Sequence, residues 1–279
     1  MTAPFASPPP GGLPPQDSLM TGRAVFTEAY AVIPRGVLTD IVASRLPNWR
    51  GTRAWILARP LSGFAETFSQ MLMEVAAGGG SETPEPTADA EAALFVTDGA
   101  AEIVIGGGTH TLTPGGFAFI PAGTLWRVAN AGDAPLRFHW VRKRYEPAPG
   151  LAPPDPIIAQ EQDIAKQPMI GTDSWSTTRF MDPDDLRHDM AMTIVTFAPG
   201  GTIPFEETHV MEHGLAILEG KGVYKLNRDW VEGQAGEFLW LRAFCPQACY
   251  AAGPGPFRYL LYKDVNRFPV LAPPDRALG

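Results

Sequence analysis

The chain has 279 residues, 45% of them hydrophobic and 19% charged, and a formal net charge of −8. This composition is typical of a folded protein with one large or two ordinary domains. The acidic balance argues against nucleic acid or an anionic membrane as a partner, because both attract basic surfaces, and no apolar run is long enough to cross a bilayer. The proline-rich residues 1–22 lack the basic and then apolar order of a signal peptide. We therefore expect a disordered tail on a cytoplasmic protein.

Short apolar runs dominate the rest of the chain. Gly- and Pro-rich turns separate these runs, with 29 residues of each type overall, and helical periodicity is scarce. This pattern predicts an all-β sandwich or barrel. The clearest predicted strands fall at residues 54–57, 68–75, 117–120, 190–197 and 259–262.

A proline-rich segment divides the chain, and the parts on either side of it repeat. Gly99 and Gly220 lie 121 positions apart, and so do Gly115 and Gly236. Glycine turns recur by chance, but a shared offset indicates a duplicated domain. The predicted division is a tail at 1–22, an N-terminal barrel at 23–145, a stiff linker at 146–168 and a C-terminal barrel at 169–279.

Candidate metal ligands gather in the C-terminal half, although the whole chain has only five histidines. If residues 207–213 form one strand, Glu207, His209 and His213 point to the same face, because side chains alternate along a strand. One carboxylate and two imidazoles on one face are a typical divalent metal site. Gln247 follows on a later predicted strand, at the distance where a second metal-binding strand is expected.

The N-terminal half has no counterpart of this set. The positions 121 residues earlier hold Pro86, Ala88, Ala92 and Trp126, none of which offers a side-chain metal ligand. We therefore predict a metal site in the C-terminal half only, and a structural role for the N-terminal half.

Two other interpretations apply to the same segment. The three polar residues can be unrelated members of a solvated strand face. The string from His209 to His213 also matches the H-x-x-E-H signature of a zinc peptidase, which requires a helix. Pro204 and Gly214 flank the segment and disfavour a helix, so we place Glu212 on the opposite face, outside the metal shell.

The halves resemble cupins, which are small jelly-roll barrels. Gly115, Pro121, Gly123 and Asn130 match the second cupin motif, with Trp126 in place of its metal-binding His. In the C-terminal half that slot holds Gln247, and the His, His and Glu of the first motif appear as Glu207, His209 and His213. This altered set resembles the (S)-ureidoglycine aminohydrolase family of bicupins, which act in purine breakdown, and the resemblance covers nearly the whole chain from about residue 22 onward.

The resemblance implies two tandem cupin barrels and the hydrolysis of (S)-ureidoglycine to (S)-ureidoglycolate and ammonia. It implies a manganese ion held by Glu207, His209, His213 and Gln247, with Tyr224, Tyr259 and Lys263 as catalytic and substrate-binding residues. Judged by donor chemistry alone, zinc, iron or nickel would also accept such a set.

Two other functions stay open at this point: a non-catalytic bicupin that binds a small acid, and a metal-dependent dioxygenase. The first would release no ammonia, and the second would consume oxygen. A duplicated barrel with one half that lacks ligands also leads us to expect a homo-oligomer. The resemblance implies a small-molecule substrate.

Overall fold

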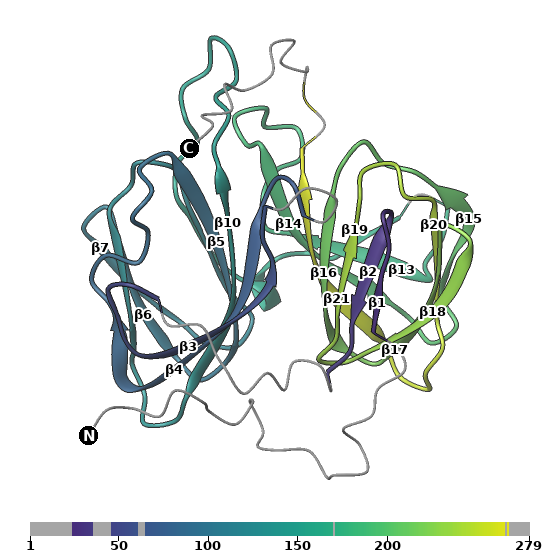
Figure 1. Cartoon of the computed structure of the whole chain (residues 1–279), viewed down its shortest axis with the longest axis horizontal. Coiled ribbons are helices and arrows are strands. Elements are labelled where there is room, and N and C mark those ends of the chain that lie inside the picture. Colours follow the sequence, from purple (N-terminus) through teal and green to yellow (C-terminus); the bar gives the residue numbers. More distant parts are fainter. Residues whose placement is uncertain (1–23, 36–45, 61–64, 170, 266, 268–279) are drawn as a thin grey trace.

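A computed structural model describes residues 24–35, 46–60, 65–169, 171–265 and 267. The predicted tail at 1–22 lies outside these residues. Within them the chain forms two strand-built barrels that lie side by side (Figure 1), so the all-β prediction with two tandem barrels is confirmed. The helical structure of the described residues is confined to a single 3₁₀ turn, Glu161–Asp163. No helix in this part of the chain has the length and hydrophobicity to span a membrane.

The N-terminal barrel is one sheet in the order β11-β8-β5-β10-β4-β9-β6-β7, with β3 paired to β4. Its strands are β3 (Trp49–Ala58), β4 (Ser69–Ser81), β5 (Ala90–Asp98), β6 (Ala101–Ile105), β7 (Gly108–Leu112), β8 (Gly116–Ile120), β9 (Trp126–Asn130), β10 (Leu136–Arg144) and β11 (Ile157–Gln160).

The C-terminal barrel is built from two sheets, in the orders β1-β2-β19-β16-β21-β14-β13-β12 and β15-β20-β17-β18. Its strands are β1 (Val25–Phe26), β2 (Tyr30–Ile33), β12 (Gln167–Pro168), β13 (Trp175–Arg179), β14 (Met190–Phe197), β15 (Thr202–Glu207), β16 (His213–Glu219), β17 (Lys221–Leu226), β18 (Asp229–Gln234), β19 (Phe238–Leu241), β20 (Gln247–Ala251) and β21 (Phe257–Asp264).

The two barrels follow the 121-residue repeat strand by strand. The order β8-β5-β10-β4 recurs as β19-β16-β21-β14, and β9 and β20 begin at Trp126 and Gln247. Gly99 and Gly220 both adopt a φ of 75° at the same turn, a left-handed conformation that glycine adopts without steric cost. The turn glycines are therefore a direct signature of the duplicated fold.

Strand pairing crosses the domain boundaries that the sequence suggested. The strand β2, from the segment assigned to the N-terminal barrel, pairs with β19 of the C-terminal barrel, and β1 and β2 appear in purple among its green strands (Figure 1). In return β11, from the expected linker, pairs with β8 of the N-terminal barrel. Because β8 and β19 are buried, their outer N–H and C=O groups need partners. The exchange supplies those partners and joins the two halves.

Each barrel has its own apolar interior, and a third cluster lies between the barrels. Strand β8 contributes to two of them by simple alternation: Phe117 and Phe119 enter the shared cluster, while Ala118 and Ile120 enter the N-terminal barrel. In the shared cluster Phe117 stacks on Phe180, with ring centroids 4.4 Å apart. The barrels are thus packed on one another through a common core.

The carboxylate of Glu212 binds the two halves together. It accepts hydrogen bonds from the backbone N–H groups of Glu66 and Thr67, each at 3.0 Å, and from the Thr67 hydroxyl at 2.6 Å. The indole N–H of Trp240 donates to the same carboxylate. Glu212 is only 4% exposed, so these donors are the groups that replace water around its charge. This arrangement agrees with the expected place of Glu212 away from the metal ligands.

We expect Glu212→Ala to lower the free energy of unfolding by about 3–5 kcal/mol, because it leaves several buried donors without an acceptor. Glu219→Ala is the matched control, since it removes an exposed carboxylate paired with Arg258 and is expected to cost less than about 1 kcal/mol. Urea unfolding of both variants measures the difference. Equal losses in the two variants would contradict this role of Glu212.

A second prediction concerns pH. The imidazole of His139 on β10 is buried, and burial lowers its pKa to about 4, whereas an unfolded chain has a His pKa of about 6.5. Folding favours the neutral ring. Its contribution to the free energy of unfolding is therefore complete above pH 6.5 and is lost as pH falls toward 4. Linkage gives a loss of about 2 kcal/mol between pH 7.5 and pH 5.

Urea unfolding at both pH values tests this assignment. His139→Leu should remove that part of the pH dependence, whereas His110→Leu, at a partly exposed position on β7, should keep it. An unchanged pH dependence in His139→Leu would refute the assignment.

Candidate metal centre

Three strands and one connection place the four predicted metal ligands. Glu207 ends β15, His213 begins β16 and Gln247 begins β20. The pairing of β15 with β20 sets Glu207 directly opposite Gln247. His209 lies in the connection between β15 and β16. All four residues line one cavity of about 250 Å³ inside the C-terminal barrel.

The prediction that residues 207–213 form one strand is wrong. Strand β15 ends at Glu207 and β16 begins only at His213, with a bend between them. The physical reason is that β15 and β16 belong to different sheets, so no single extended strand joins them. The bend is held where the Phe244 N–H donates to the His209 carbonyl at 2.6 Å. The donors share a cavity because the chain turns there, and strand alternation does not explain it.

The two imidazoles differ in their surroundings. His213 is buried, and desolvation, with the nearby His209 and Lys263, lowers its pKa to about 3, so the ring is neutral at pH 7. Its Nδ1 lies 3.1 Å from the Glu212 carbonyl, a contact that favours a proton on Nδ1 and a free lone pair on Nε2. His209 Nε2 lies 3.3 Å from Glu207 Oε1, and the two His rings are 5.2 Å apart between centroids.

These side chains fit a divalent cation by chemistry and by position. Two imidazole nitrogens, a carboxylate and an amide oxygen border the same small cavity, and such mixed donors suit Mn²⁺ and neighbouring divalent metals. In the described part of the chain, however, no three His, Cys, Asp or Glu side chains already stand in a metal-holding arrangement. The contact between His209 and Glu207 turns those two donors toward each other. Metal binding by these four residues therefore stays a prediction.

Two of the three predicted catalytic residues line the same cavity. Tyr259 and Lys263 come from β21 and line the cavity together with His213 and Gln247. Burial raises the pKa of Tyr259, so its hydroxyl stays protonated and can donate a hydrogen bond. Burial, together with the charge of Arg179, lowers the pKa of Lys263.

Tyr224 does not line the cavity. It is fully buried in the interior of the C-terminal barrel, with its ring centroid 6.2 Å from that of Tyr259. Burial, with Cys249 and Tyr259 close to it, raises its pKa well above the usual range. Its position fits support of Tyr259 better than direct contact with a ligand.

One charged residue of the cavity escaped the sequence analysis. Arg179, at the end of β13, lines the cavity together with Lys263. The repeat gives no signal for it, because strand pairing sets Arg179 opposite Thr193 but sets Ala58, 121 residues earlier, opposite Gln70. The constant offset therefore does not extend to this strand.

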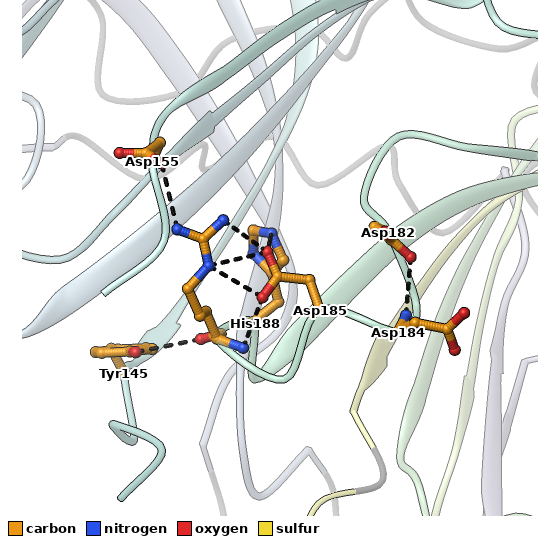
Figure 2. A network of polar contacts seen from close by, with 7 residues as sticks. Tyr145, Asp155, Asp182, Asp184, Asp185 and His188 are labelled. Carbon is orange, nitrogen blue, oxygen red and sulfur yellow. Dashed lines mark hydrogen bonds and ion pairs between the residues drawn. The ribbon is translucent and has the colours of Figure 1, made fainter. Parts of the chain in front are cut away.

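The loop that follows β13 is fixed by polar contacts (Figure 2). Its residues Met181 and Pro183 line the cavity. Farther along the same loop, the Arg187 guanidinium binds Asp185 at 2.8 Å and Asp155 at 3.2 Å. The Tyr145 hydroxyl donates to the Arg187 carbonyl at 3.2 Å. These bonds hold the loop against the segment that connects the barrels.

Comparisons with known proteins agree with this architecture. The cupin domain family matches residues 71–142. The chain is 31% identical to the (S)-ureidoglycine aminohydrolase of Escherichia coli K12, over 90% of this chain and 95% of that protein. It is also 31% identical to the (S)-ureidoglycine aminohydrolase of Arabidopsis thaliana, over 89% of this chain and 80% of that protein.

A solved structure is more similar still. The putative glyoxylate-induced protein from Pseudomonas aeruginosa is 56% identical, with a TM-score of 0.87 over 97% of this chain and 99% of the other. The identity of 31–33% to relatives named (S)-ureidoglycine aminohydrolase, over 89–90% of this chain, confirms the resemblance found in the sequence. The chain belongs to the (S)-ureidoglycine aminohydrolase family, and its two barrels are cupin barrels.

Proposed function

We propose that the protein is a metal-dependent (S)-ureidoglycine aminohydrolase, which converts (S)-ureidoglycine and water to (S)-ureidoglycolate and ammonia. The observation that carries the proposal is one small cavity lined by Glu207, His209, His213, Gln247 and Lys263, in a chain whose relatives bear that name. In the reaction the bond from the α-carbon to its amine breaks and a bond from that carbon to a water oxygen forms. The water's second hydrogen leaves with the amine as ammonia.

The four donors would hold a divalent cation, for which we propose Mn²⁺. Bound there, the cation supplies positive charge that offsets the acid substrate and fixes the reacting carbon. Glu207 is the only charged donor, so it contributes the electrostatic part of the binding. The buried neutral ring of His213 contributes a lone pair without first having to lose a proton.

The remaining residues of the cavity handle the substrate and its protons. Lys263 donates a proton to the departing amine, in keeping with its buried position and lowered pKa. Tyr259 donates a hydrogen bond from its protonated hydroxyl to the ureido group. Tyr224 packs behind Tyr259 and keeps that ring in place. These contacts do not favour the two alternatives, a non-catalytic bicupin that binds a small acid and a metal-dependent dioxygenase.

We further propose that the protein works in the cytoplasm as a homo-oligomer on this small-molecule substrate. Support for self-association comes from the outer sheet of the C-terminal barrel, which carries large exposed apolar side chains: Phe205, Trp230 and Tyr250. The acidic net charge of −8 supports the absence of nucleic-acid and anionic membrane partners. Light scattering of the purified protein decides the oligomeric state.

We expect Glu207→Ala to abolish both bound metal and ammonia release, because it removes the only charged donor. Metal content by mass spectrometry and ammonia release from freshly made ureidoglycine are measured on the same sample. Glu206→Ala is the matched control, since its neighbouring carboxylate is paired with Lys225 on the surface and lies outside the cavity lining. Turnover by a metal-free Glu207→Ala protein would refute the metal mechanism.

We expect Lys263→Met to retain the metal and to lower kcat by about 10²–10⁴-fold, the usual contribution of a positioned proton donor. Lys225→Met, at a surface ion pair, should keep the wild-type rate. Stopped-time ammonia assays with metal analysis measure both variants. An unchanged rate for Lys263→Met would remove Lys263 from the mechanism.

A further inference from the structure

In the part of the chain that the structure describes, two positively charged side chains line the cavity without a carboxylate partner of their own. Arg179 and Lys263 both line it, and among the described residues neither side chain takes part in an ion pair. The hydrogen bond found for the Arg179 side chain runs from its Nε to the Thr177 hydroxyl at 3.2 Å. The carboxylate lining the cavity is Glu207, a predicted metal ligand that already contacts His209. Two partly desolvated cations in so small a space favour an anion between them.

Strand register places the two cations on the same face of the sheet. Lys263 pairs with His213 on one side and with Ala191 on the other. Arg179 pairs with Thr193 of the same strand, β14. Only the small side chains of Ala191 and Thr193 therefore stand between the two charged groups, and all of these residues line the cavity. Burial lowers the pKa of Lys263, and the nearby charge of Arg179 lowers it further.

The row of strands also gives the cavity a direction. Moving from β16 through β21 and β14 to β13 leads from the predicted metal donor His213, past Lys263, to Arg179. At a strand spacing of about 4.8 Å, the backbones of His213 and Arg179 stand roughly 14 Å apart across the sheet. The long Arg179 side chain reaches back over part of that distance. The cavity that this row of residues lines has a volume of about 250 Å³.

We propose that Arg179 binds the carboxylate of the substrate and so selects α-substituted ureido acids over uncharged ureas; this inference rests on the proposed function. A guanidinium has a planar pair of N–H donors that matches the two oxygens of a carboxylate. The ammonium group of Lys has no such planar pair. If Arg179 binds the carboxylate, Lys263 remains available to donate a proton to the departing amine.

The test uses full-length, Mn²⁺-loaded protein and two stable ligands: N-carbamoylglycine, which has the carboxylate, and its neutral amide. Calorimetry gives the Kd of each ligand for wild type and for Arg179→Gln, Arg179→Lys and Arg127→Gln. Arg127 is an exposed arginine of the N-terminal barrel and serves as the control. Metal content and circular dichroism confirm that each variant is folded and loaded.

We expect Arg179→Gln to weaken the binding of N-carbamoylglycine by about 10–100-fold, the loss typical of a charge-assisted pair, and to leave the amide within about twofold. Arg179→Lys should recover part of the loss, and Arg127→Gln should match wild type. With ureidoglycine, KM should rise more than kcat falls. If Arg179→Gln does not fold, the Arg179→Lys protein alone decides, by a selective loss of the acid.

Three results would overturn the proposal: equal weakening of acid and amide, unchanged binding of the acid, or a wild-type protein that does not prefer the acid. Failure of the proposed function looks different. In that case wild-type protein releases no ammonia from ureidoglycine, yet its preference for the acid still depends on Arg179.

Discussion

The double burial of β8 and β19 determines how this protein is assembled. A strand with apolar side chains on both faces cannot lie at an open edge, because its outer backbone groups would be left without water or partners. Phe117 and Phe119 of β8 enter the core between the barrels, and Ala118 and Ile120 enter the barrel itself. Each of these strands therefore pairs with a strand from the chain segment that precedes the other barrel: β19 pairs with β2, and β8 pairs with β11. The shared core and the exchanged strands are two results of the same constraint.

Duplication left two barrels with the same strand order and different interiors. In the N-terminal barrel Trp126, Trp140 and Trp49 fill the space, with ring centroids of 5.5 and 5.9 Å between neighbours. The matching region of the C-terminal barrel holds Gln247 and the open cavity. One copy thus uses aromatic volume where the other keeps room for polar donors.

The sequence predicts the strands and their duplication well, because both depend on local patterns: alternation, turn glycines and a constant offset. It also identifies Glu207, His209, His213 and Gln247 as neighbours, although for a partly mistaken reason. The bend between Glu207 and His213 depends on which sheet each strand joins, and that is decided by distant pairing. The exchange of β2 was invisible for the same reason, since its partner β19 lies about two hundred residues away in the chain. The role predicted for Tyr224 was implied by the family resemblance. A resemblance indicates that a residue has a role, but it does not tell how far the residue lies from the cavity.

The bonds of Glu212 have a consequence for how this protein can change over generations. Glu212 immediately precedes His213, and its carboxylate is held by backbone groups of the opposite barrel. A gene shortened to the second barrel would therefore lose the contacts that hold Glu212, next to the predicted metal donor His213, as well as the strand that pairs with β19. The N-terminal barrel therefore cannot be deleted without removing contacts that stabilise the C-terminal barrel. Its surface is free to diverge, but the stretch around Glu66 and Thr67 is inherited as part of the site.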